Sequence, residues 1–294
     1  LQVFCEKIIL KMAIYSKEIC NSNNLCMAGG VALNCVANGK IQKENIFKNI
    51  WIQPASGDSG NSLGAAYFLY HNILKNRRIT NKNCQDLMKN SKLGPSYKDD
   101  EIAAFLDSVN AKYKYIDSDL DLCQILIDDL LEGKIFGLFR GRMEFGPRAL
   151  GSRSIIGDPR SQSTQTKMNL KIKFRESFRP FAPFILKDHV HNWFENASYD
   201  NKYMLFVNKL KKEKRLNEES QFSFEGEMLD LLNKERSEVP AITHIDYTAR
   251  VQTVSKEDNP FINHLLEIFY KKTSLPFLVN TSFNVRGEPI VCSP

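Results

Sequence analysis

The sequence predicts an α/β fold, in which short strands alternate with helices around apolar cores. One observation is a short apolar run, residues 25–28, that leads into Gly29 and Gly30 and then into helical apolar spacing. A second is the succession of helix-spaced segments and short apolar runs through the rest of the chain, which is typical of α/β domains. The third is size: 294 residues with 43% hydrophobic side chains suffice for a substantial core and favour about two domains.

The first part of the chain predicts helices separated by short strands. Apolar residues at helical spacing predict a helix over residues 3–18. A strand followed by Gly-Gly and a helix is the pattern by which actin-like and hexokinase-like folds bring backbone beside a nucleotide. Tight turns also need glycine, so the glycine pair alone leaves a structural role open. The elements expected next are a helix over 31–39, a strand over 50–53, a Gly- and Ser-rich turn over 54–60 and a helix over 61–71.

The middle and end of the chain predict a second set of elements. Residues 75–95 contain many Asn and Lys residues and a Gly-Pro pair, which predicts a linker. Residues 209–220 form a charged insert that we expect to be mobile. The remaining elements expected are helices over 99–108, 120–132 and 259–272, and strands over 113–116, 135–139 and 277–279.

The segment 141–160, GRMEFGPRALGSRSIIGDPR, predicts an anion-binding loop. Glycine lets backbone N–H groups approach a ligand closely, and guanidinium groups bind phosphate or carboxylate oxygens in pairs. The alternative is a solvated basic loop, because most charged residues lie on the surface. The arginines concerned are Arg142, Arg148, Arg153 and Arg160.

A second basic segment follows, in which cations alternate with apolar residues. The alternation predicts a half-buried strand with Lys171, Lys173 and Arg175 on one face, so that the cations converge. Arg179 follows them, and we expect Pro180 and Pro183 to end the strand.

A third candidate segment consists of polar residues that directly follow the expected strand 277–279. The sequence Asn280-Thr-Ser-Phe-Asn284 places hydroxyl and amide groups at the strand end, where they become ligand contacts or form a turn. Arg250 lies in an apolar, β-branched segment. Burying an arginine there is costly unless it is paired, which leaves an ion pair or a ligand contact as its role.

Composition argues for an anionic small molecule as ligand. The chain has 40 Lys and Arg against 34 Asp and Glu, a mild excess that is concentrated near the predicted anion loop, so we expect no nucleic acid partner. Seven cysteines without a C-x-x-C pair indicate reduced thiols in a cytoplasmic protein. No apolar run approaches about 18 residues, so we expect no membrane association.

Several blocks of the sequence together resemble one family. GRMEFGPRALGSRSI, KFRESFRPFAP, PAITHIDYTARVQTV and NTSFNVRGEPIV resemble the C-terminal half of the O-carbamoyltransferases of antibiotic and nodulation-factor synthesis. LCMAGGVALN and PASGDSGNSLGAA resemble the end of their N-terminal domain. The resemblance implies a YrdC-like α/β domain over residues 96–294, after the C-terminal part of an actin- and hexokinase-like (ASKHA) domain over 1–74 and the linker 75–95. Both ends of the sequence then look cut: the first domain lacks its beginning, and the second domain lacks its end.

The resemblance also implies a reaction. Members of the family activate carbamoyl phosphate with ATP to carbamoyl-adenylate and transfer the carbamoyl group to a hydroxyl of a small-molecule acceptor. Lys173-Phe-Arg175 and Ser282-Phe-Asn284 are similar to the Lys-x-Arg and Ser-x-Asn pairs of threonylcarbamoyl-adenylate synthases. The implied catalytic residues are Lys173 and Arg148, and the implied ATP-binding residues are Gly29, Gly30, Arg175, Arg179, Arg250, Ser282 and Asn284. One departure is Tyr247, which stands where the family more often has Gly and is expected to narrow the pocket or stack on adenine.

Asp58 is the candidate metal ligand. A carboxylate in a Gly- and Ser-rich loop is often a helix cap, but the resemblance implies a metal-binding Asp here, holding a divalent metal, iron. A His-x-x-x-His pair would supply its partners from outside this chain. His189-x-His191 is a weaker alternative, because such pairs usually lie on the surface by chance.

Two other functions remain open. The first is a relative of threonylcarbamoyl-adenylate synthase that acts in tRNA modification with threonine and bicarbonate; it leaves the GGVALN and SGDSGNS blocks unexplained. The second is a non-catalytic nucleotide- or RNA-binding module, whose affinity for RNA would fall steeply with salt. The oligomeric state is also open, with a homodimer as one alternative.

Overall fold

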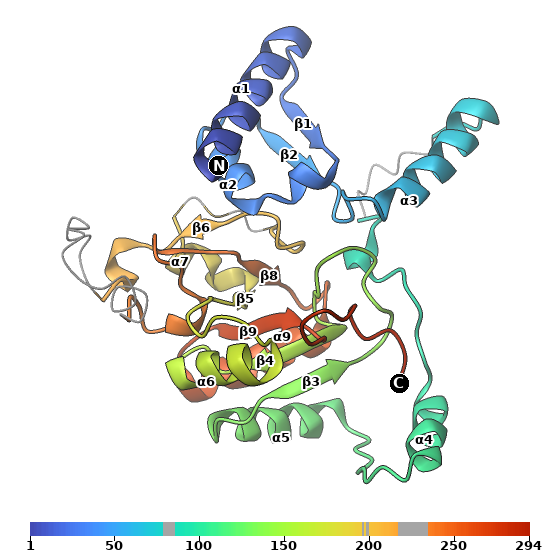
Figure 1. Cartoon of the computed structure of the whole chain (residues 1–294), viewed down its shortest axis with the longest axis vertical. Coiled ribbons are helices and arrows are strands. Elements are labelled where there is room, and N and C mark those ends of the chain that lie inside the picture. The colour runs from blue at the N-terminus through green and yellow to red at the C-terminus, as the bar shows by residue number, and fades with distance from the viewer. Residues whose placement is uncertain (79–85, 196, 198–199, 217–234) are drawn as a thin grey trace.

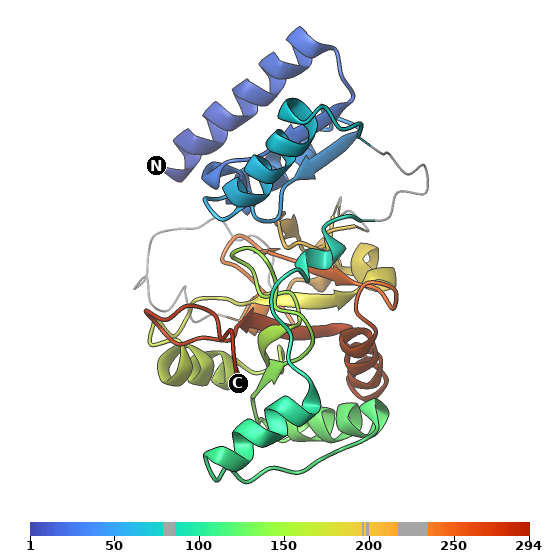
Figure 2. The ribbon, with the colours of Figure 1, turned by 90° about the vertical axis from the view of Figure 1, so that its right-hand side faces the viewer.

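Figure 1 shows the computed structural model of the chain, which describes residues 1–78, 86–195, 197, 200–216 and 235–294. Helices and mixed sheets make up these residues, so the predicted α/β class is confirmed. The N-terminal elements lie at one end of the long axis, and a larger body built on a mixed sheet occupies the rest (Figures 1 and 2). None of the described helices combines the length and apolar character needed to cross a membrane.

The N-terminal elements follow the prediction closely. The predicted strands pair in parallel as β1 and β2, and the predicted second helix is split into a 3-10 turn and an α-helix. Helix α1 packs on α2 through Ile9, Ala13 and Ile41. The elements are α1 (Gln2–Cys20), β1 (Asn24–Met27), η1 (Gly30–Leu33), α2 (Cys35–Lys43), β2 (Asn49–Ile52), α3 (Gly60–Tyr67) and η2 (Phe68–Ile73).

Helix α1 has a second apolar face that points to solvent. Its residues recur every three or four positions, so they form one stripe along the helix, opposite the side that contacts α2. The stripe consists of Phe4, Ile8, Met12, Tyr15 and Ile19, which are 41% to 66% exposed.

The body is built on one mixed sheet. Among the described residues, five strands pair in the order β3-β4-β9-β5-β8, and neighbours are antiparallel except for the parallel pair β5 and β8. Helix α9 packs against β5 and β9, and α5 packs against α9. The bounds are β3 (Phe136–Phe139), β4 (Arg153–Gly157), β5 (Ala182–Leu186), β8 (Gln252–Val254), β9 (Phe277–Ser282), α5 (Asp119–Leu131) and α9 (Pro260–Thr273).

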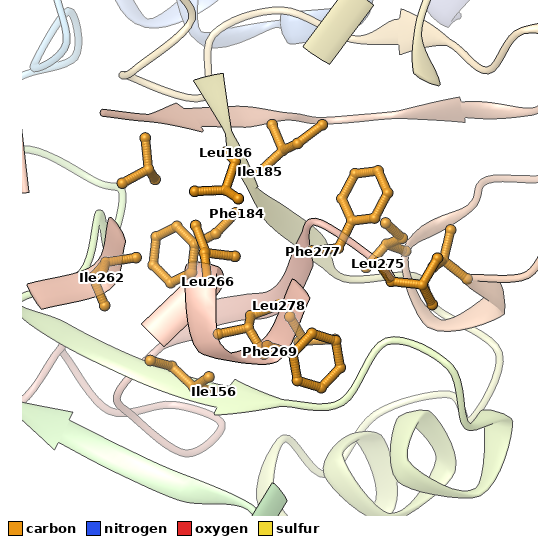
Figure 3. Close-up of a cluster of buried hydrophobic side chains, with 14 of the residues drawn as sticks. Ile156, Phe184, Ile185, Leu186, Ile262, Leu266, Phe269, Leu275, Phe277 and Leu278 are labelled. Atoms are coloured by element: carbon orange, nitrogen blue, oxygen red, sulfur yellow. The ribbon is translucent and has the colours of Figure 1, made fainter. Parts of the chain in front are cut away.

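The main apolar core lies between the sheet and α9. Figure 3 shows Phe184 and Leu278 from the sheet beside Leu266 and Phe269 from α9, and all four are fully buried. The helix begins where the side chain of Asn259 accepts a hydrogen bond from the N–H of Ile262 at 3.3 Å, with proline at the first helical position. These contacts fix β9, whose last residues carry the polar Asn280-to-Asn284 sequence.

Shorter elements complete the described chain. The helices over 99–108 and 120–132 are confirmed as α4 and α5, to within a residue or two. The remaining elements are η3 (Lys89–Ser91), α4 (Asp99–Ser108), α6 (Gln162–Lys167), η4 (Met168–Ile172), η5 (Lys187–His189), α7 (Val190–Trp193), β6 (Asn208–Lys209), η6 (Lys212–Lys214), η7 (Pro240–Ile242) and β7 (Thr248–Ala249).

Two predicted strands are wrong. Residues 113–116 form neither helix nor strand, although apolar and polar residues alternate in this segment. The segment from Lys171 to Arg175 is the end of the π-helical turn η4 followed by Phe174 at φ 47°, and not a strand. As a result Lys171 is exposed while Lys173 is buried, so the two do not share a face. A left-handed residue cannot continue a ladder, which explains the departure.

Pro183 does not end a strand, because it lies inside β5. It is opposite Val279 of β9, whereas pairing with β8 begins one residue later at Phe184. Proline has no N–H to donate, and here only one neighbouring strand flanks it.

The expected linker and insert pack against the body where they are described. Phe145 donates its N–H to the oxygen of Ser91 at 2.6 Å, and Gly94 donates to Met143 at 2.9 Å, so residues 91–94 line the arginine-rich loop. In the expected insert, Leu210 is fully buried between flanking short elements. Residues 79–85 of the linker and the insert residues after 216 lie outside the described part.

Candidate functional site

The arginine-rich segment forms an irregular loop between β3 and β4, and its arginines have different surroundings. Gly146 and Gly151 have φ angles of 130° and 104°, which favour glycine and shape the turn around Arg148. Arg148 lines a large cavity, and the other three arginines do not. Arg142 is exposed and donates to Gly94, Arg153 is fully buried with its guanidinium 3.6 Å from the Phe139 ring centre, and Arg160 pairs with Asp158 at 2.6 Å.

The cavity beside Arg148 collects most of the predicted anion-binding residues. Its volume is about 460 Å³, and no carboxylate belongs to the described residues that line it. Four arginines reach it from three separate stretches of the chain, and the end of β9 supplies hydroxyl and amide groups. The residues that line the cavity include Arg148, Arg175, Arg179, Arg250, Ser282, Asn280, His244, Cys35 and Met204.

The arginines raise the positive potential of the cavity because they lie close to one another. The pKa of Arg250 is lowered to about 10, first by burial and then by the charge of Arg148. Burial also lowers the pKa of Arg148. Nε of Arg148 and Nε of Arg250 are buried and without a hydrogen-bond partner among the described residues. Like charges held together in this way favour an anion between them.

Arg175 and Arg179 form the outer side of the cavity. Arg175 donates from Nε to Oδ1 of Asn169 at 2.7 Å, and its guanidinium lies 4.8 Å from the centre of the Phe181 ring. The pKa of Arg175 is lowered to about 10 by burial and by Arg179. Arg179 is exposed and pairs with Glu176 at 2.9 Å. Arg175 is therefore fixed in place, whereas Arg179 lies at the rim.

Lys173 lies behind the cavity wall and not in it. Its ammonium donates to the Oγ of Ser282 at 3.2 Å and to the Oδ1 of Asn284 at 2.9 Å, and Ser282 but not Asn284 lines the cavity. Burial and then the charge of Arg175 lower the pKa of Lys173 to about 8. The structure thus brings the Lys-x-Arg and Ser-x-Asn pairs together, with the lysine supporting the serine.

Several cavity residues were missed from the sequence. Cys35, at the start of α2, lies beside Arg250 in the cavity wall, and Met204 lines the same cavity. Nδ1 of His244 is hydrogen-bonded to Oγ1 of Thr248 at 2.9 Å. Burial and the charge of Arg250 lower the pKa of His244, although the charge of Asp246 acts to raise it. His244 could have been suspected, because it stands in the same block as Arg250; nothing local marked Cys35 or Met204.

Tyr247 does not narrow the cavity, contrary to expectation. It is buried, has φ 62° and lies 5.2 Å from the guanidinium of Arg215, and it is absent from the described cavity lining. A positive φ favours glycine, which gives a physical reason for glycine at this place in the family.

The other predicted residues lie in a second cavity, in the N-terminal part. Gly29, Gly30 and Asp58 line this space of about 550 Å³ beside β1, β2 and the start of α3. Gly29 has φ 96°, so the glycine pair forms the sharp turn after β1. The two cavities are separate, but Arg148 donates from Nη2 to the oxygen of Leu33 at 3.3 Å, so η1 contacts the arginine loop.

The described residues do not by themselves form a metal centre. No group of three or more His, Cys, Asp or Glu side chains among them could hold a metal ion. Asp58 supplies one carboxylate, whereas transition metals in proteins normally have several N, O or S ligands. The ring of His189 lies 4.4 Å from that of Tyr270, and the His-x-His alternative gains no support.

Comparison with known proteins identifies the family. Residues 127–294 match the sequence family described as Carbamoyltransferase C-terminus, and residues 1–67 match the one described as Carbamoyltransferase N-terminus. The chain belongs to the carbamoyltransferase family. The resemblance seen in the sequence is therefore confirmed.

The relatives of this carbamoyltransferase chain are longer than it is. It is 50% identical over 300 residues to an uncharacterized protein of Synechocystis. This match covers 100% of the chain and 47% of the Synechocystis protein. It is 37% identical over 298 residues to nodulation protein NolO of Bradyrhizobium diazoefficiens, in a match that covers 100% of the chain and 49% of NolO. It is 32% identical over 267 residues to nodulation protein U of Azorhizobium caulinodans, in a match that covers 91% of the chain and 40% of that protein. The chain spans about half the length of the curated relatives it matches.

Proposed function

We propose that this chain carries the activating half of an O-carbamoyltransferase. The cavity beside Arg148 binds ATP and carbamoyl phosphate and forms carbamoyl-adenylate, whose carbamoyl group passes to a hydroxyl of a small-molecule acceptor. The observation that carries the proposal is the convergence of four arginines on a cavity with no carboxylate among its described lining residues. Such a site is suited to the clustered negative charge of phosphates.

The proposed reaction needs stabilisation of phosphate charge at two stages. Water releases the phosphate of carbamoyl phosphate, and the resulting carbamate oxygen attacks the α-phosphorus of ATP. The bond from that phosphorus to the β-phosphate oxygen breaks, and pyrophosphate leaves with the electron pair. Arg148 and Arg250 hold the phosphates, because their buried Nε groups lack partners among the described residues. Preorganised cations of this kind stabilise charge that develops during transfer.

Lys173 acts in this proposal from behind the wall. Its ammonium fixes Ser282 and Asn284 and adds positive charge close to the cavity. Ser282 then presents its hydroxyl to the carbamoyl or adenylate end of the ligand. Arg175 and Arg179 hold the phosphates that lie toward the rim.

The N-terminal cavity has a separate role in the proposal. Gly29 and Gly30 bring backbone close to a ligand there, and Asp58 contributes one carboxylate to a divalent metal site, with iron as the metal. The other ligands come from polypeptide outside this sequence. Because the described residues make no complete metal site, we assign the transfer step itself to no residue of this chain.

The fold assignment belongs to the same proposal. We assign the body on the mixed sheet to the YrdC-like class, over about residues 96–294, and residues 1–74 to the actin- and hexokinase-like class. The mixed sheet, with β5 and β8 parallel and its other described pairs antiparallel, supports a single α/β domain around the cavity. The protein is proposed to act in the cytoplasm.

The experiment is to incubate the chain with ATP and carbamoyl phosphate and to measure pyrophosphate and AMP. We expect both to accumulate without an acceptor, because carbamoyl-adenylate that is not transferred is hydrolysed. Binding of each ligand is measured in parallel by calorimetry. A folded chain that neither binds nor releases pyrophosphate contradicts the proposal.

The same assay separates the runner-up functions. A threonylcarbamoyl-adenylate synthase relative would release pyrophosphate with threonine and bicarbonate and not with carbamoyl phosphate. An RNA-binding module would bind RNA with an affinity that falls steeply as salt rises, and would release no pyrophosphate.

A further inference from the structure

Glu144 belongs to the same loop between β3 and β4 as Arg148, and its carboxylate is buried. Glu144 is 5% exposed and does not line the cavity. Its Oε1 accepts hydrogen bonds from the N–H groups of Leu150 and Ser152, both at 2.7 Å, with the N–H of Arg153 at 3.4 Å. One buried side chain therefore holds the backbone on the C-terminal side of Arg148.

Side chains from the sheet hold the same backbone through its oxygens. Asn280 of β9 donates from Nδ2 to the oxygen of Ala149 at 2.8 Å, and Gln252 of β8 donates from Nε2 to the oxygen of Leu150 at 3.1 Å. Asn280 also donates to Oε1 of Gln252 at 2.9 Å. The turn after Arg148 is thus fixed on both its N–H and its C=O groups by three buried polar side chains.

These bonds replace the regular pairing that an irregular buried segment lacks. Buried N–H and C=O groups need partners, and a carboxylate that accepts from backbone N–H groups makes charge-assisted bonds. Gly151 cannot be replaced freely, because its φ is 104° and an added Cβ would lie 2.8 Å from Nδ2 of Asn259. Glu144 therefore holds the backbone close to Arg148 through the N–H groups of Leu150 and Ser152.

We propose that Glu144 is a positioning residue that presents Arg148 to the anion in the cavity. It touches no ligand and acts through the backbone of residues 150–153. This inference rests on the proposed function, since it takes Arg148 to be a phosphate ligand. A side chain that is misplaced by about 1 Å can lose about a hundredfold in effect, so the support of the loop matters.

The test is a double-mutant cycle on the whole chain, with pyrophosphate as the probe and calorimetry as the measurement. The variants are Glu144→Leu, which removes the acceptor, Glu144→Gln, which keeps an amide oxygen, Arg148→Met, and the double variant Glu144→Leu/Arg148→Met. We expect Glu144→Leu to weaken pyrophosphate binding about tenfold or more and Glu144→Gln to restore most of it. In the Arg148→Met background, Glu144→Leu should change the affinity by less than about twofold.

A matched control and a second support variant keep the test decisive. Glu132→Leu removes an exposed carboxylate outside the loop and should leave binding unchanged. If Glu144→Leu fails to fold, Gln252→Leu removes support from the opposite side and is expected to show the same coupling to Arg148.

The outcomes distinguish this inference from the proposed function. Equal losses from Glu144→Leu with and without Arg148 would mean a general structural role and overturn the inference. Wild-type affinity in folded Glu144→Leu would do the same. Wild-type affinity in Arg148→Met would instead remove Arg148 from the proposed site, and the inference would fall with it.

Discussion

Lys173 and Asn284 are joined by a hydrogen bond of 2.9 Å between Nζ and Oδ1, although 111 residues separate them in the sequence. The same ammonium contacts Ser282, whose side chain lies on the cavity wall. The Lys-x-Arg and Ser-x-Asn pairs, which we propose to act on one ligand, are therefore also bound to each other. Because the pKa of Lys173 is lowered to about 8, we expect the affinity of the cavity for anions to depend on pH.

Pyrophosphate binding should weaken as the pH rises through about 8. The pKa of Lys173 lies at about 8, lowered by burial and by Arg175, so the ammonium is charged below this pH and loses its charge above it. The attraction for an anion is lost with the charge. The measurement is calorimetric affinity from about pH 6.5 to about pH 9.5, a range that spans this titration.

Lys173→Arg is the control for this pH profile, because arginine stays charged across the range. Both proteins meet the same ligand, so ionisation of pyrophosphate itself cancels in the ratio of their affinities. A ratio that is constant across the range would contradict the assignment of the titrating group to Lys173.

Arg148→Met and Lys173→Met should each slow pyrophosphate release by about a hundredfold or more, which corresponds to roughly 3 kcal/mol of lost charge stabilisation. Arg142→Met is the matched control in the same loop, since Arg142 is exposed and does not line the cavity. The rates are measured with ATP and carbamoyl phosphate at saturation. Wild-type rates in the first two variants would show that these cations do not stabilise the transferring groups.

Modification of Cys35 by a maleimide should slow when pyrophosphate fills the cavity. The thiol lies on the cavity wall beside Arg250, so a bound anion covers it. Cys26 lines the N-terminal cavity and is exposed, and its modification rate should not change. Mass spectrometry of the two peptides gives both rates in one reaction. Protection of Cys26 with no protection of Cys35 would mean that pyrophosphate binds in the N-terminal cavity and not in the cavity beside Arg148.

Two phenylalanines should differ sharply in their contribution to stability. Phe269 is fully buried against the sheet, so Phe269→Ala should lower the free energy of unfolding by about 3 to 5 kcal/mol. Phe4 is 66% exposed on α1, and Phe4→Ala should change it by less than about 0.5 kcal/mol. Urea unfolding followed by circular dichroism measures both. Equal losses would mean that the exposed face of α1 is packed in the isolated chain.

The sequence predicted the members of the site better than their arrangement. Arg148 stands in a segment whose residue types indicate an anion site, the family resemblance implied ligand roles for Arg250 and Ser282, and the structure brings all three to one cavity. Lys173 was expected on a strand face, but a π-helical turn and a left-handed Phe174 place it behind the wall. Local spacing carries no information on such a turn, which depends on packing against distant residues.

Two of the strands that were missed, β4 and β5, share one physical property. β4 and β5 are buried along their whole length, so apolar and polar residues do not alternate in them. A continuous run of this kind gives no period-two signal, and Pro183 in β5 argued against a strand. Cys35 and Met204 reach the cavity through long-range packing, which no local motif reports.

The two apolar faces of α1 have a practical consequence for work on the chain. One face is covered by α2, and the stripe from Phe4 to Ile19 is open to solvent. Hydrophobic dyes that report unfolding by binding exposed apolar surface will also bind this stripe in the folded protein. A dye-based melting curve of the isolated chain will begin from a high signal, so intrinsic fluorescence or circular dichroism is the better readout of ligand effects.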